Sequence, residues 1–328
     1  MDRRAVKRLG KVLGVVAILV VAAFLVFRVP DTDPKAMRAK YGGPPSRFLD
    51  LGDGLEVHLR DEGPRNAPAI ILLHGSNADL FTWQPWVDRL KGQYRLVRFD
   101  QRGHGLTGAA PDGNYARAAF AGDIERVAGK LGLERFVLAG NSMGGGIALD
   151  YALSHPGRLA GLVLVDAAGA PQLKKARGNI GFTIARTPVV GSLMSQFTPR
   201  SLVERSLRQS VSNQAIVTPT TVDRYWELLR YPGNRAATME RFSARPQPFA
   251  PADLSRLRVP TLIIWGAQDP LIPLSSGKWL ASHIPGARIA ILPGIGHIPM
   301  EEAPDASAAL LDKWVAEIAA NQAKAQVR

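Results

Sequence analysis

The sequence predicts an α/β fold in which a mostly parallel central sheet is flanked by helices. Short apolar runs recur along the chain, each bounded by Gly, Pro or polar residues, and this pattern is typical of strands that are covered on both faces. Helix-like segments separate these runs, which favours parallel connections. One run passes directly into a Gly-x-Ser-x-Gly sequence at residues 140–144. Since 328 residues with 46% hydrophobic composition can bury a substantial core, we expect one large domain.

The first thirty residues predict an N-terminal apolar helix, which acts as a membrane anchor or a signal sequence over residues 1–29. Basic residues precede the apolar run from Val12 to Phe27, as in segments whose N-terminus stays in the cytoplasm. The run is close to the lower limit of about 17 residues for crossing a bilayer. We favour an uncleaved transmembrane anchor, because residues 24–27 stay apolar beyond the small-residue site at 21–23. The rest of the chain would then be periplasmic or extracellular; the alternative is secretion after signal cleavage.

The remaining chain divides into a linker, a main fold and an insertion. The Pro and Gly content of residues 30–45 indicates a linker without regular structure. The main fold is expected over residues 46–168 and 251–328. Between these two parts the strand-like runs stop and helix-like pieces take over, so residues 169–250 are expected to form a helical insertion.

Ser142 lies where an apolar run turns into a helical pattern, with Gly140 and Gly144 two residues away on either side. A serine hydroxyl is a weak nucleophile, and a tight strand-to-helix turn exposes it beside backbone amides and within reach of a base. The two glycines lack the side chains that would crowd such a turn. The sequence therefore predicts a nucleophile elbow at Ser142.

An elbow serine needs an acid and a base, which follow it along the chain in this type of site. Asp269 comes after the apolar run 260–265, and His297 lies on a loop after the next such run. Because parallel strands end at one edge of a sheet, we expect both side chains to approach Ser142. Asp166 ends another strand-like run and is the alternative acid, although an Asp at a strand end commonly caps a turn or a helix.

The other histidines have structural explanations. His283 is expected on an amphipathic helix, and His155 at the end of the helix that follows Ser142, where a cation complements the helix dipole. His58 alternates with apolar neighbours, so we expect it on the surface of a strand.

Attack on a carbonyl also needs hydrogen-bond donors for the oxyanion, and backbone amides suffice. The residue after the nucleophile, Met143, is expected to supply one amide. The other comes from the loop after the apolar run 69–73. In that loop we choose Ser76 as the donor, with Asn77 as the next candidate, and we expect His74 to hold the loop by a local hydrogen bond.

Five motifs appear in one register: His74-Gly75, Arg102-Gly103-His104-Gly105, Gly140-Asn141-Ser142-Met143-Gly144-Gly145, Gly266-Ala267-Gln268-Asp269 and Gly296-His297. With them the chain resembles the α/β-hydrolase-fold serine hydrolases, in the esterase- and lipase-like subgroup that has a GxSMGG elbow and a cap. The resemblance spans about residues 46 to 320 and is weaker in the middle. It implies the triad Ser142, Asp269 and His297, a helical cap over residues 169–250, and a structural loop at residues 102–105. We expect Arg102 to anchor that loop through Asp100 or backbone carbonyls.

The expected cap carries most of the net positive charge of the protein. Twelve Lys and Arg residues face four acidic residues there, so twelve minus four leaves +8 of the formal +13. The default interpretation is a solvated helix face. The alternatives are contact with anionic lipid headgroups and attraction of an acidic substrate. No recognition motif accompanies the charge, so we expect no nucleic-acid partner.

The predicted reaction is hydrolysis of carboxylic esters, with acyl lipids among the candidate substrates and a membrane contacted through the N-terminal helix. Serine, histidine and water suffice for it, so no cofactor is expected. The chain has no cysteine and no HExxH sequence, which leaves a thiolate or zinc mechanism without support. The sequence does not indicate an oligomeric state.

Two other functions stay open. A carbon–carbon bond hydrolase of the same fold shares the elbow, but such relatives usually have a Trp shortly after the catalytic His, where this chain has Pro299 and Met300. A non-catalytic binding protein of this fold is less favoured, because such proteins generally lack one member of the triad.

Overall fold

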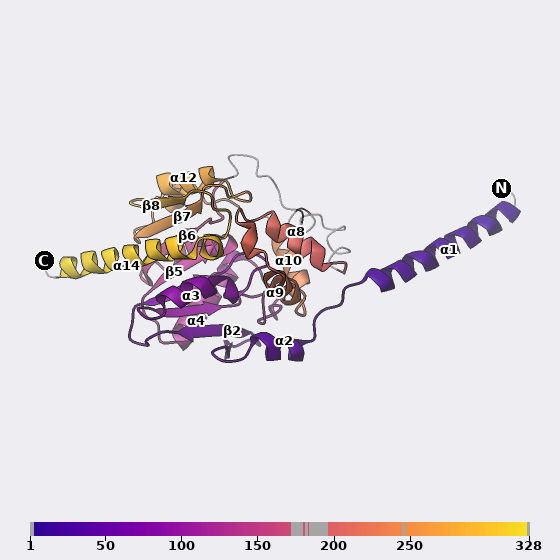
Figure 1. Cartoon of the computed structure of the whole chain (residues 1–328), viewed down its shortest axis with the longest axis horizontal. Coiled ribbons are helices and arrows are strands. Elements are labelled where there is room, and N and C mark those ends of the chain that lie inside the picture. Colours follow the sequence, from indigo (N-terminus) through magenta and orange to yellow (C-terminus); the bar gives the residue numbers. More distant parts are fainter. Residues whose placement is uncertain (1–2, 172–179, 181–182, 184–195, 245–246, 327–328) are drawn as a thin grey trace.

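The computed structural model describes residues 3–171, 180, 183, 196–244 and 247–326. Its centre is an eight-stranded sheet with the order β1-β2-β4-β3-β5-β6-β7-β8 (Figure 1). The strands are β1 (Arg47–Asp50), β2 (Glu56–Glu62), β3 (Ala69–Leu73), β4 (Arg95–Phe99), β5 (Phe136–Asn141), β6 (Leu159–Val165), β7 (Thr261–Gly266) and β8 (Arg288–Leu292). The six strands from β4 to β8 run parallel, and β1 and β2 pair antiparallel at one edge. This confirms the predicted fold.

Helices cover both faces of the sheet. One face packs against α3 (Gln84–Leu90), the short α13 (Pro299–Glu302) and the long α14 (Pro304–Gln326), and the other against α4 (Arg117–Lys130), α5 (Met143–Ser154), α11 (Pro251–Leu254) and α12 (Leu274–His283). Strand β5 shows why both faces are apolar. Phe136 and Leu138 belong to one core cluster, while Val137 and Ala139 belong to the other, because successive side chains of a strand point to opposite faces.

The parallel strands deliver the chemistry-bearing residues to one edge of the sheet. His74 follows β3, Ser142 follows β5 and Asp166 follows β6, and Asp269 and His297 come shortly after β7 and β8. Carboxyl ends of parallel strands meet at the same edge, where α/β folds place their sites. The topology therefore gathers all five residues.

Between β6 and β7 the described residues form helices joined by loops, with no strand among them. This part of the chain contains α8 (Arg200–Arg208), the 3₁₀ helix η2 (Gln214–Ile216), α9 (Pro219–Leu229) and α10 (Asn234–Ser243). The start of α9 follows sequence rules, since Thr218 accepts a hydrogen bond from the Thr221 amide and Pro219 opens the helix. The division of the chain into core and cap at residues 169 and 250 stays a prediction.

The expected linker is partly helical, which corrects our interpretation of residues 30–45. Helix α2 covers Pro34–Tyr41. Asp33 caps it by accepting a hydrogen bond of 2.8 Å from the Lys35 amide, and Pro34 suits the first helical position. Met37 is buried against apolar residues from elsewhere in the chain. The N-terminal cap of α2 and the burial of Met37 thus stabilise a helix in a segment whose Pro and Gly content is typical of loops.

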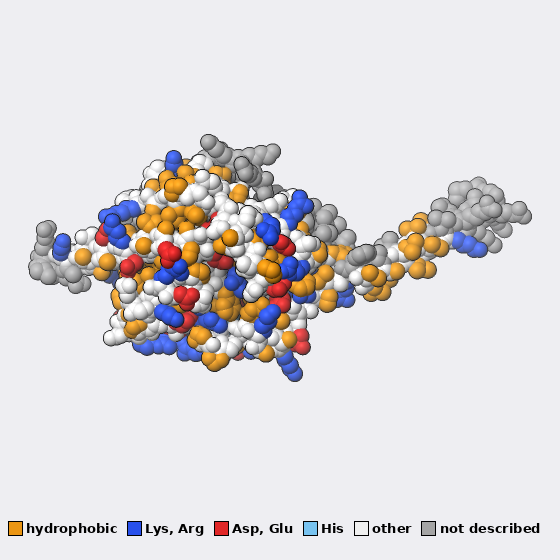
Figure 2. Space-filling view, in the orientation of Figure 1, with side chains coloured by type: hydrophobic (Ala, Val, Ile, Leu, Met, Phe, Trp, Pro, Cys, Tyr) orange, Lys and Arg blue, Asp and Glu red, His pale blue; other side chains and the backbone are white. Residues whose placement is uncertain are grey.

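Residues Arg3–Phe27 form α1, which extends away from the body of the protein (Figure 1). Figure 2 shows hydrophobic side chains along it, and Ile18, Leu25 and Val26 are more than 60% exposed. Among the residues that the structure describes, no helix has the length and apolar character needed to cross a membrane. The expected transmembrane anchor is therefore not supported, and the location of the remaining chain stays a prediction.

Candidate active site

Ser142 occupies a strained turn between β5 and α5. Its φ of +52° and ψ of −118° are unusual for a residue with a side chain, and such strain costs about 1–3 kcal/mol. The backbone secures it, because the Ser142 amide donates to the Val165 carbonyl at 3.0 Å and the Ala168 amide donates to the Ser142 carbonyl at 2.9 Å. Strain at a serine that the fold holds in place is what a nucleophile elbow requires.

The glycines beside Ser142 are needed for close backbone approach. A Cβ atom at Gly140 would lie 2.3 Å from the Gly144 carbonyl oxygen, and one at Gly144 would lie 2.4 Å from the Leu73 carbonyl oxygen. Both neighbours are backbone atoms, which cannot rotate away as a side chain can. The turn therefore accepts only glycine at these two positions.

Gly144→Ala is expected to lower the free energy of unfolding by about 3 kcal/mol, since the added methyl group forces two segments of backbone apart. Urea denaturation followed by circular dichroism measures the change. Gly122→Ala in α4 is the matched control, because nothing lies within 4 Å of its added Cβ, and it should be neutral or more stable by about 1 kcal/mol. Equal stability of the two variants would contradict this account.

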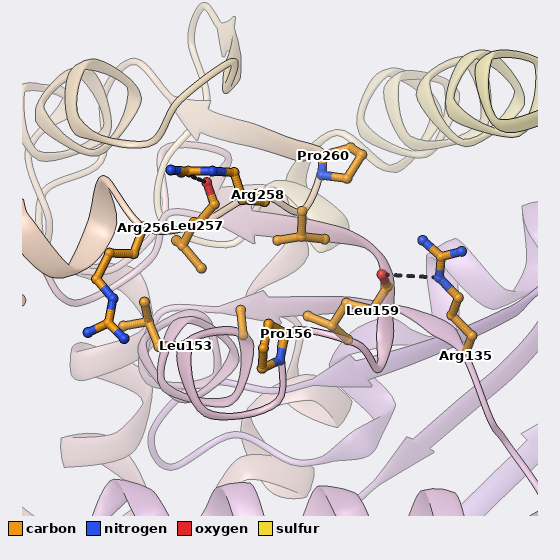
Figure 3. A pocket seen from close by; sticks show the side chains of 10 residues that line it. Arg135, Leu153, Pro156, Leu159, Arg256, Leu257, Arg258 and Pro260 are labelled. Carbon is orange, nitrogen blue, oxygen red and sulfur yellow. Dashed lines mark hydrogen bonds between the residues drawn. The ribbon is translucent and has the colours of Figure 1, made fainter. Parts of the chain in front are cut away.

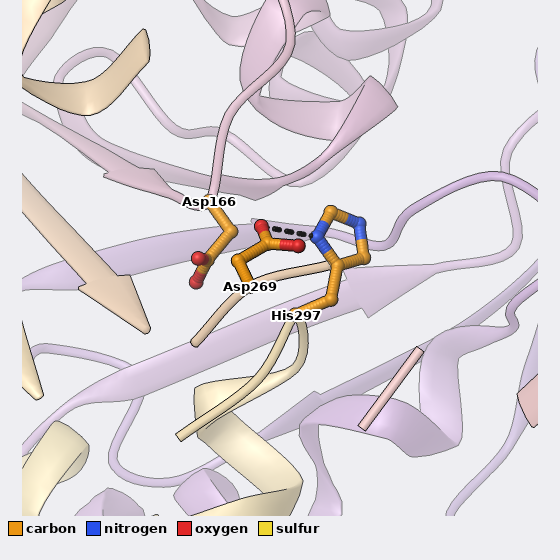
Figure 4. Close-up of side chains that lie close together, drawn as sticks. All are labelled: Asp166, Asp269 and His297. Atoms are coloured by element: carbon orange, nitrogen blue, oxygen red, sulfur yellow. Dashed lines mark hydrogen bonds and ion pairs between the residues drawn. The ribbon is translucent and has the colours of Figure 1, made fainter. Parts of the chain in front are cut away.

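His297 and Asp269 are joined by a hydrogen bond of 2.7 Å between Nδ1 and Oδ2 (Figure 4). Both side chains are buried. The Asp269 Oδ1 atom accepts from the amides of Leu271 at 2.7 Å and Ile272 at 3.0 Å, so the loop itself fixes the carboxylate. Because Nδ1 is engaged by Asp269, the other ring nitrogen, Nε2, is left to accept a proton.

The loop that carries His297 lies against the elbow. The Asn141 side-chain amide donates to the His297 carbonyl at 3.0 Å and to the Val165 carbonyl at 3.1 Å. Within the described part of the chain no hydrogen bond joins the Ser142 hydroxyl to His297, and such bonds are often long before substrate binds. The contact between these two side chains stays a prediction.

The two residues expected to stabilise an oxyanion lie side by side. The Ser76 hydroxyl donates to the Met143 sulfur at 3.3 Å. A Cβ atom at Gly75 would lie 3.1 Å from the Ser142 Cβ, which shows how closely this loop approaches the elbow. The role of the Ser76 and Met143 amides stays a prediction.

His74 holds its loop, as expected. Its Nδ1 donates to the Gly75 carbonyl at 2.8 Å, and its Nε2 accepts from the Gln101 amide at 3.1 Å. Burial lowers the pKa of His74, which keeps the ring neutral and lets one nitrogen accept a hydrogen bond.

Asp166 lies beside the Asp269–His297 pair, but it is not bonded to His297 in the described structure. One carboxylate oxygen from each acid and one imidazole nitrogen lie within 4.8 Å of one another. These three buried side chains are of the types that bind metal ions. A shared ion would have to replace the bond between His297 and Asp269. We therefore treat the group as a hydrogen-bonded proton site.

The comparisons with known proteins identify the family. The family model for the alpha/beta hydrolase fold matches residues 68–304, which is more than half of the chain. The chain belongs to the alpha/beta-hydrolase family.

Relatives of this α/β hydrolase include several kinds of hydrolase. It is 28% identical to human monoacylglycerol lipase ABHD6 over 273 residues, 78% of this chain and 77% of that protein. It is 26% identical to the 2-hydroxy-6-oxononadienedioate/2-hydroxy-6-oxononatrienedioate hydrolase of Comamonas testosteroni, over 80% of this chain and 93% of that one. The solved structure of a bacterial membrane phospholipase A is similar with a TM-score of 0.71 and 26% identity, over 95% and 99% of the two chains. The chain is therefore a hydrolase.

One sequence interpretation outside the site was wrong, and a second was met with an added partner. His58 is fully buried, and its Nδ1 atom lies 2.7 Å from Asp100 Oδ2. It is therefore not on the surface of a strand. Arg102 donates to the Asn114 carbonyl at 2.6 Å, as expected. It also pairs with Asp123, with Nε and Oδ2 2.6 Å apart, and not with Asp100. In both cases the partner belongs to a segment that the local pattern does not reveal.

The cap of this α/β hydrolase uses part of its basic charge inside the protein. Arg230, Arg235 and Arg241 are at most 9% exposed, so a solvated helix face is the wrong interpretation for them. Arg235 pairs with Asp31 at 2.6 Å. Burial lowers the pKa of Arg241 to about 9, and Arg241 donates to Thr238 at 3.1 Å. The basic residues Lys174, Lys175, Arg177, Arg186 and Arg245 lie outside the described residues.

Sequence reasoning missed a buried charge cluster that joins the cap to the loops after β3 and β8. Arg224 of α9 lies 3.3 Å from Asp79, which follows the loop of Ser76, and 3.5 Å from Glu301, which follows His297. Burial raises the pKa of both carboxyl groups, while Arg224 lowers it. In the sequence Asp79 comes just before an apolar pair and Glu301 just after Met300, a pattern that does not by itself show burial.

A cavity of about 230 Å³ lies away from these residues (Figure 3). It is lined at the starts of β6 and β7 by Leu159, Val259 and Pro260 among others, with Arg135, Arg256 and Arg258 around it. Since β6 and β7 are parallel, this is the sheet edge opposite Asp166 and Asp269. The cavity therefore has no part in chemistry at Ser142.

Proposed function

We propose that this α/β hydrolase cleaves carboxylic esters through Ser142, His297 and Asp269. The observation that carries the proposal is the strained turn at Ser142 beside a loop whose His297 is bonded to Asp269. A turn of this kind is retained against its cost in stability when the exposed hydroxyl takes part in chemistry.

The proposed reaction has two steps. His297 Nε2 takes the proton from the Ser142 hydroxyl while the Ser142 oxygen attacks the ester carbonyl and forms the tetrahedral intermediate. Asp269 stabilises the resulting imidazolium of His297. The Ser76 and Met143 amides donate to the oxyanion. His297 then gives the proton to the departing alkoxide, which leaves as an alcohol. Water, deprotonated by His297, then attacks the acyl-serine carbonyl. The bond to the Ser142 oxygen breaks, His297 returns the proton to that oxygen, and the carboxylic acid is released.

Acyl lipids are the substrate class that we propose for this reaction. The support comes from two relatives, a monoacylglycerol lipase and a membrane phospholipase A. A series of p-nitrophenyl esters of increasing chain length, followed by monoacylglycerol in mixed micelles and in vesicles with and without anionic lipid, tests this class. Highest kcat/KM on the long-chain and micellar substrates is expected.

Hydrolysis of a carbon–carbon bond is the second candidate. The similarity to the hydrolase of Comamonas testosteroni supports this second reaction. The residues after His297 argue against it, because Pro299 and Met300 occupy the place where such hydrolases usually have a Trp. A vinylogous 1,5-diketone acid, followed by loss of its absorbance, separates the two reactions. Turnover of this compound above that of every ester would favour the second candidate.

A fluorophosphonate probe tests the mechanism directly. We expect stoichiometric labelling of Ser142 in the wild-type protein, because only an activated serine displaces fluoride from phosphorus at an appreciable rate. Mass spectrometry of the labelled peptide locates the adduct. Ser76→Ala is the matched control and should label normally, since the proposed contribution of Ser76 is its backbone amide. Labelling that persists in Ser142→Ala would contradict the proposal.

A further inference from the structure

Asp166 is a buried acid that the proposed mechanism does not use. It has 0% exposure and a φ of +43°, a conformation that is uncommon for a residue with a side chain. Its Oδ1 atom accepts a hydrogen bond of 3.0 Å from the Gly266 amide. Its Oδ2 atom is buried and receives no hydrogen bond from the described residues. An ionised carboxylate with one buried oxygen that accepts no hydrogen bond would cost the protein folding free energy.

The neighbouring acid is much better supplied with donors. Asp269 accepts hydrogen bonds from the amides of Leu271 and Ile272 and from His297. Within the described structure these are three donors, against the single one at Asp166. Two carboxylates that share a buried site cannot both ionise easily. The negative charge therefore resides on Asp269, and a proton resides on Asp166.

The other charged groups around Asp166 favour the same assignment. Asp269, His297 and Glu302 face it, and Glu302 accepts hydrogen bonds from the amides of Ser212 and Asn213. Burial and the Asp269 charge raise the pKa of Asp166 well above its ordinary value. Figure 4 shows the Asp166 carboxyl group beside that of Asp269, on the side away from the imidazole.

We propose that Asp166 is a neutral carboxylic acid whose Oδ2 proton is donated as a hydrogen bond to the Asp269 carboxylate, so that Asp166 positions Asp269 for His297. Its effect on the reaction rests on the proposed function, while its protonation does not. Asp166 is a positioning residue: its proton stays on Asp166 through the cycle, and no bond to it forms or breaks.

Infrared spectroscopy tests the protonation without any substrate. Ser142→Ala protein with isotope-labelled aspartate should show the carbonyl band of a protonated, hydrogen-bonded carboxyl group at neutral pH, and the band should vanish in Ser142→Ala/Asp166→Asn. A spectrum that shows only ionised aspartate at neutral pH would overturn the proposal, whether or not the enzyme proves to be an esterase.

The pH dependence of stability gives a second readout. Since the folded-state pKa of Asp166 is raised, its protonation stabilises the fold fully below the unfolded-state pKa, and this contribution is lost as the pH rises toward the folded-state pKa. The amide side chain of the Asp166→Asn variant cannot titrate. The Tm of Asp166→Asn relative to wild type should therefore rise between about pH 5 and about pH 9, and a constant difference would count against the proposal.

Kinetics separates positioning from mere packing. Asp166→Asn keeps a donor for Asp269 and tolerates the positive φ, so its kcat/KM should stay within about threefold of wild type, whereas Asp166→Ala should lower kcat by about 10-fold to 100-fold with KM little changed. Equal kcat for the two variants would refute the positioning role. If wild type hydrolyses esters but the infrared band is absent, only this inference fails.

Discussion

Ser142→Ala is expected to lower kcat for p-nitrophenyl ester hydrolysis by about 10⁴-fold to 10⁶-fold, with KM little changed. The variant keeps the amides that would hold the oxyanion, but it has no oxygen to form the acyl-enzyme. Stopped-flow and steady-state kinetics on the same ester measure the loss. Retention of full turnover would mean that another group performs the attack.

Ser142→Gly separates the chemistry from the strain. It removes the same hydroxyl, so its activity should match that of Ser142→Ala. Its Tm should be higher than that of Ser142→Ala, because glycine adopts the φ of +52° without the usual cost. Equal Tm values would show that the turn at Ser142 stores little strain.

Asp269→Asn is expected to lower kcat/KM by about 10⁴-fold at neutral pH. The asparagine side chain fits the same space, but its amide can donate to His297 Nδ1 and so favours the tautomer that cannot accept the serine proton at Nε2. Circular dichroism and Tm should stay close to wild type, which places the loss in the chemistry.

Asp166→Asn is the matched control for Asp269→Asn, since the two acids are adjacent and both are buried. The expected order of activity is wild type, then Asp166→Asn, and far below them Asp269→Asn. The reverse order would make Asp166 the acid of the site.

Local patterns in the chain were enough to predict the sheet and the candidate site. Apolar runs bounded by Gly and Pro marked β3, β5, β6 and β7, because a strand covered on both faces must be apolar throughout. The run at β8 was also apolar, although β8 is an edge strand that is only partly covered. The glycines around Ser142 predicted a close backbone turn. Parallel strands bring their carboxyl ends to one edge of the sheet whatever the sequence of the helices between them.

Partnerships between distant segments could not be predicted in this way. The linker pattern did not show that Met37 would be buried, nor did the cap pattern show that Arg224 would lie between Asp79 and Glu301. The sequence marked Asp166 only as a second acid at a strand end.

The amino-acid order alone thus specified the strands, the turn at Ser142 and the candidate acids and base that follow it, since each depends on periodicity or on backbone sterics within a few residues. Folding in three dimensions decided which of the two acids pairs with His297, which arginines of the cap are buried and how many donors each carboxyl group receives. Those outcomes depend on burial and on Coulomb interactions between side chains far apart in the chain, and both exist only once the chain has packed.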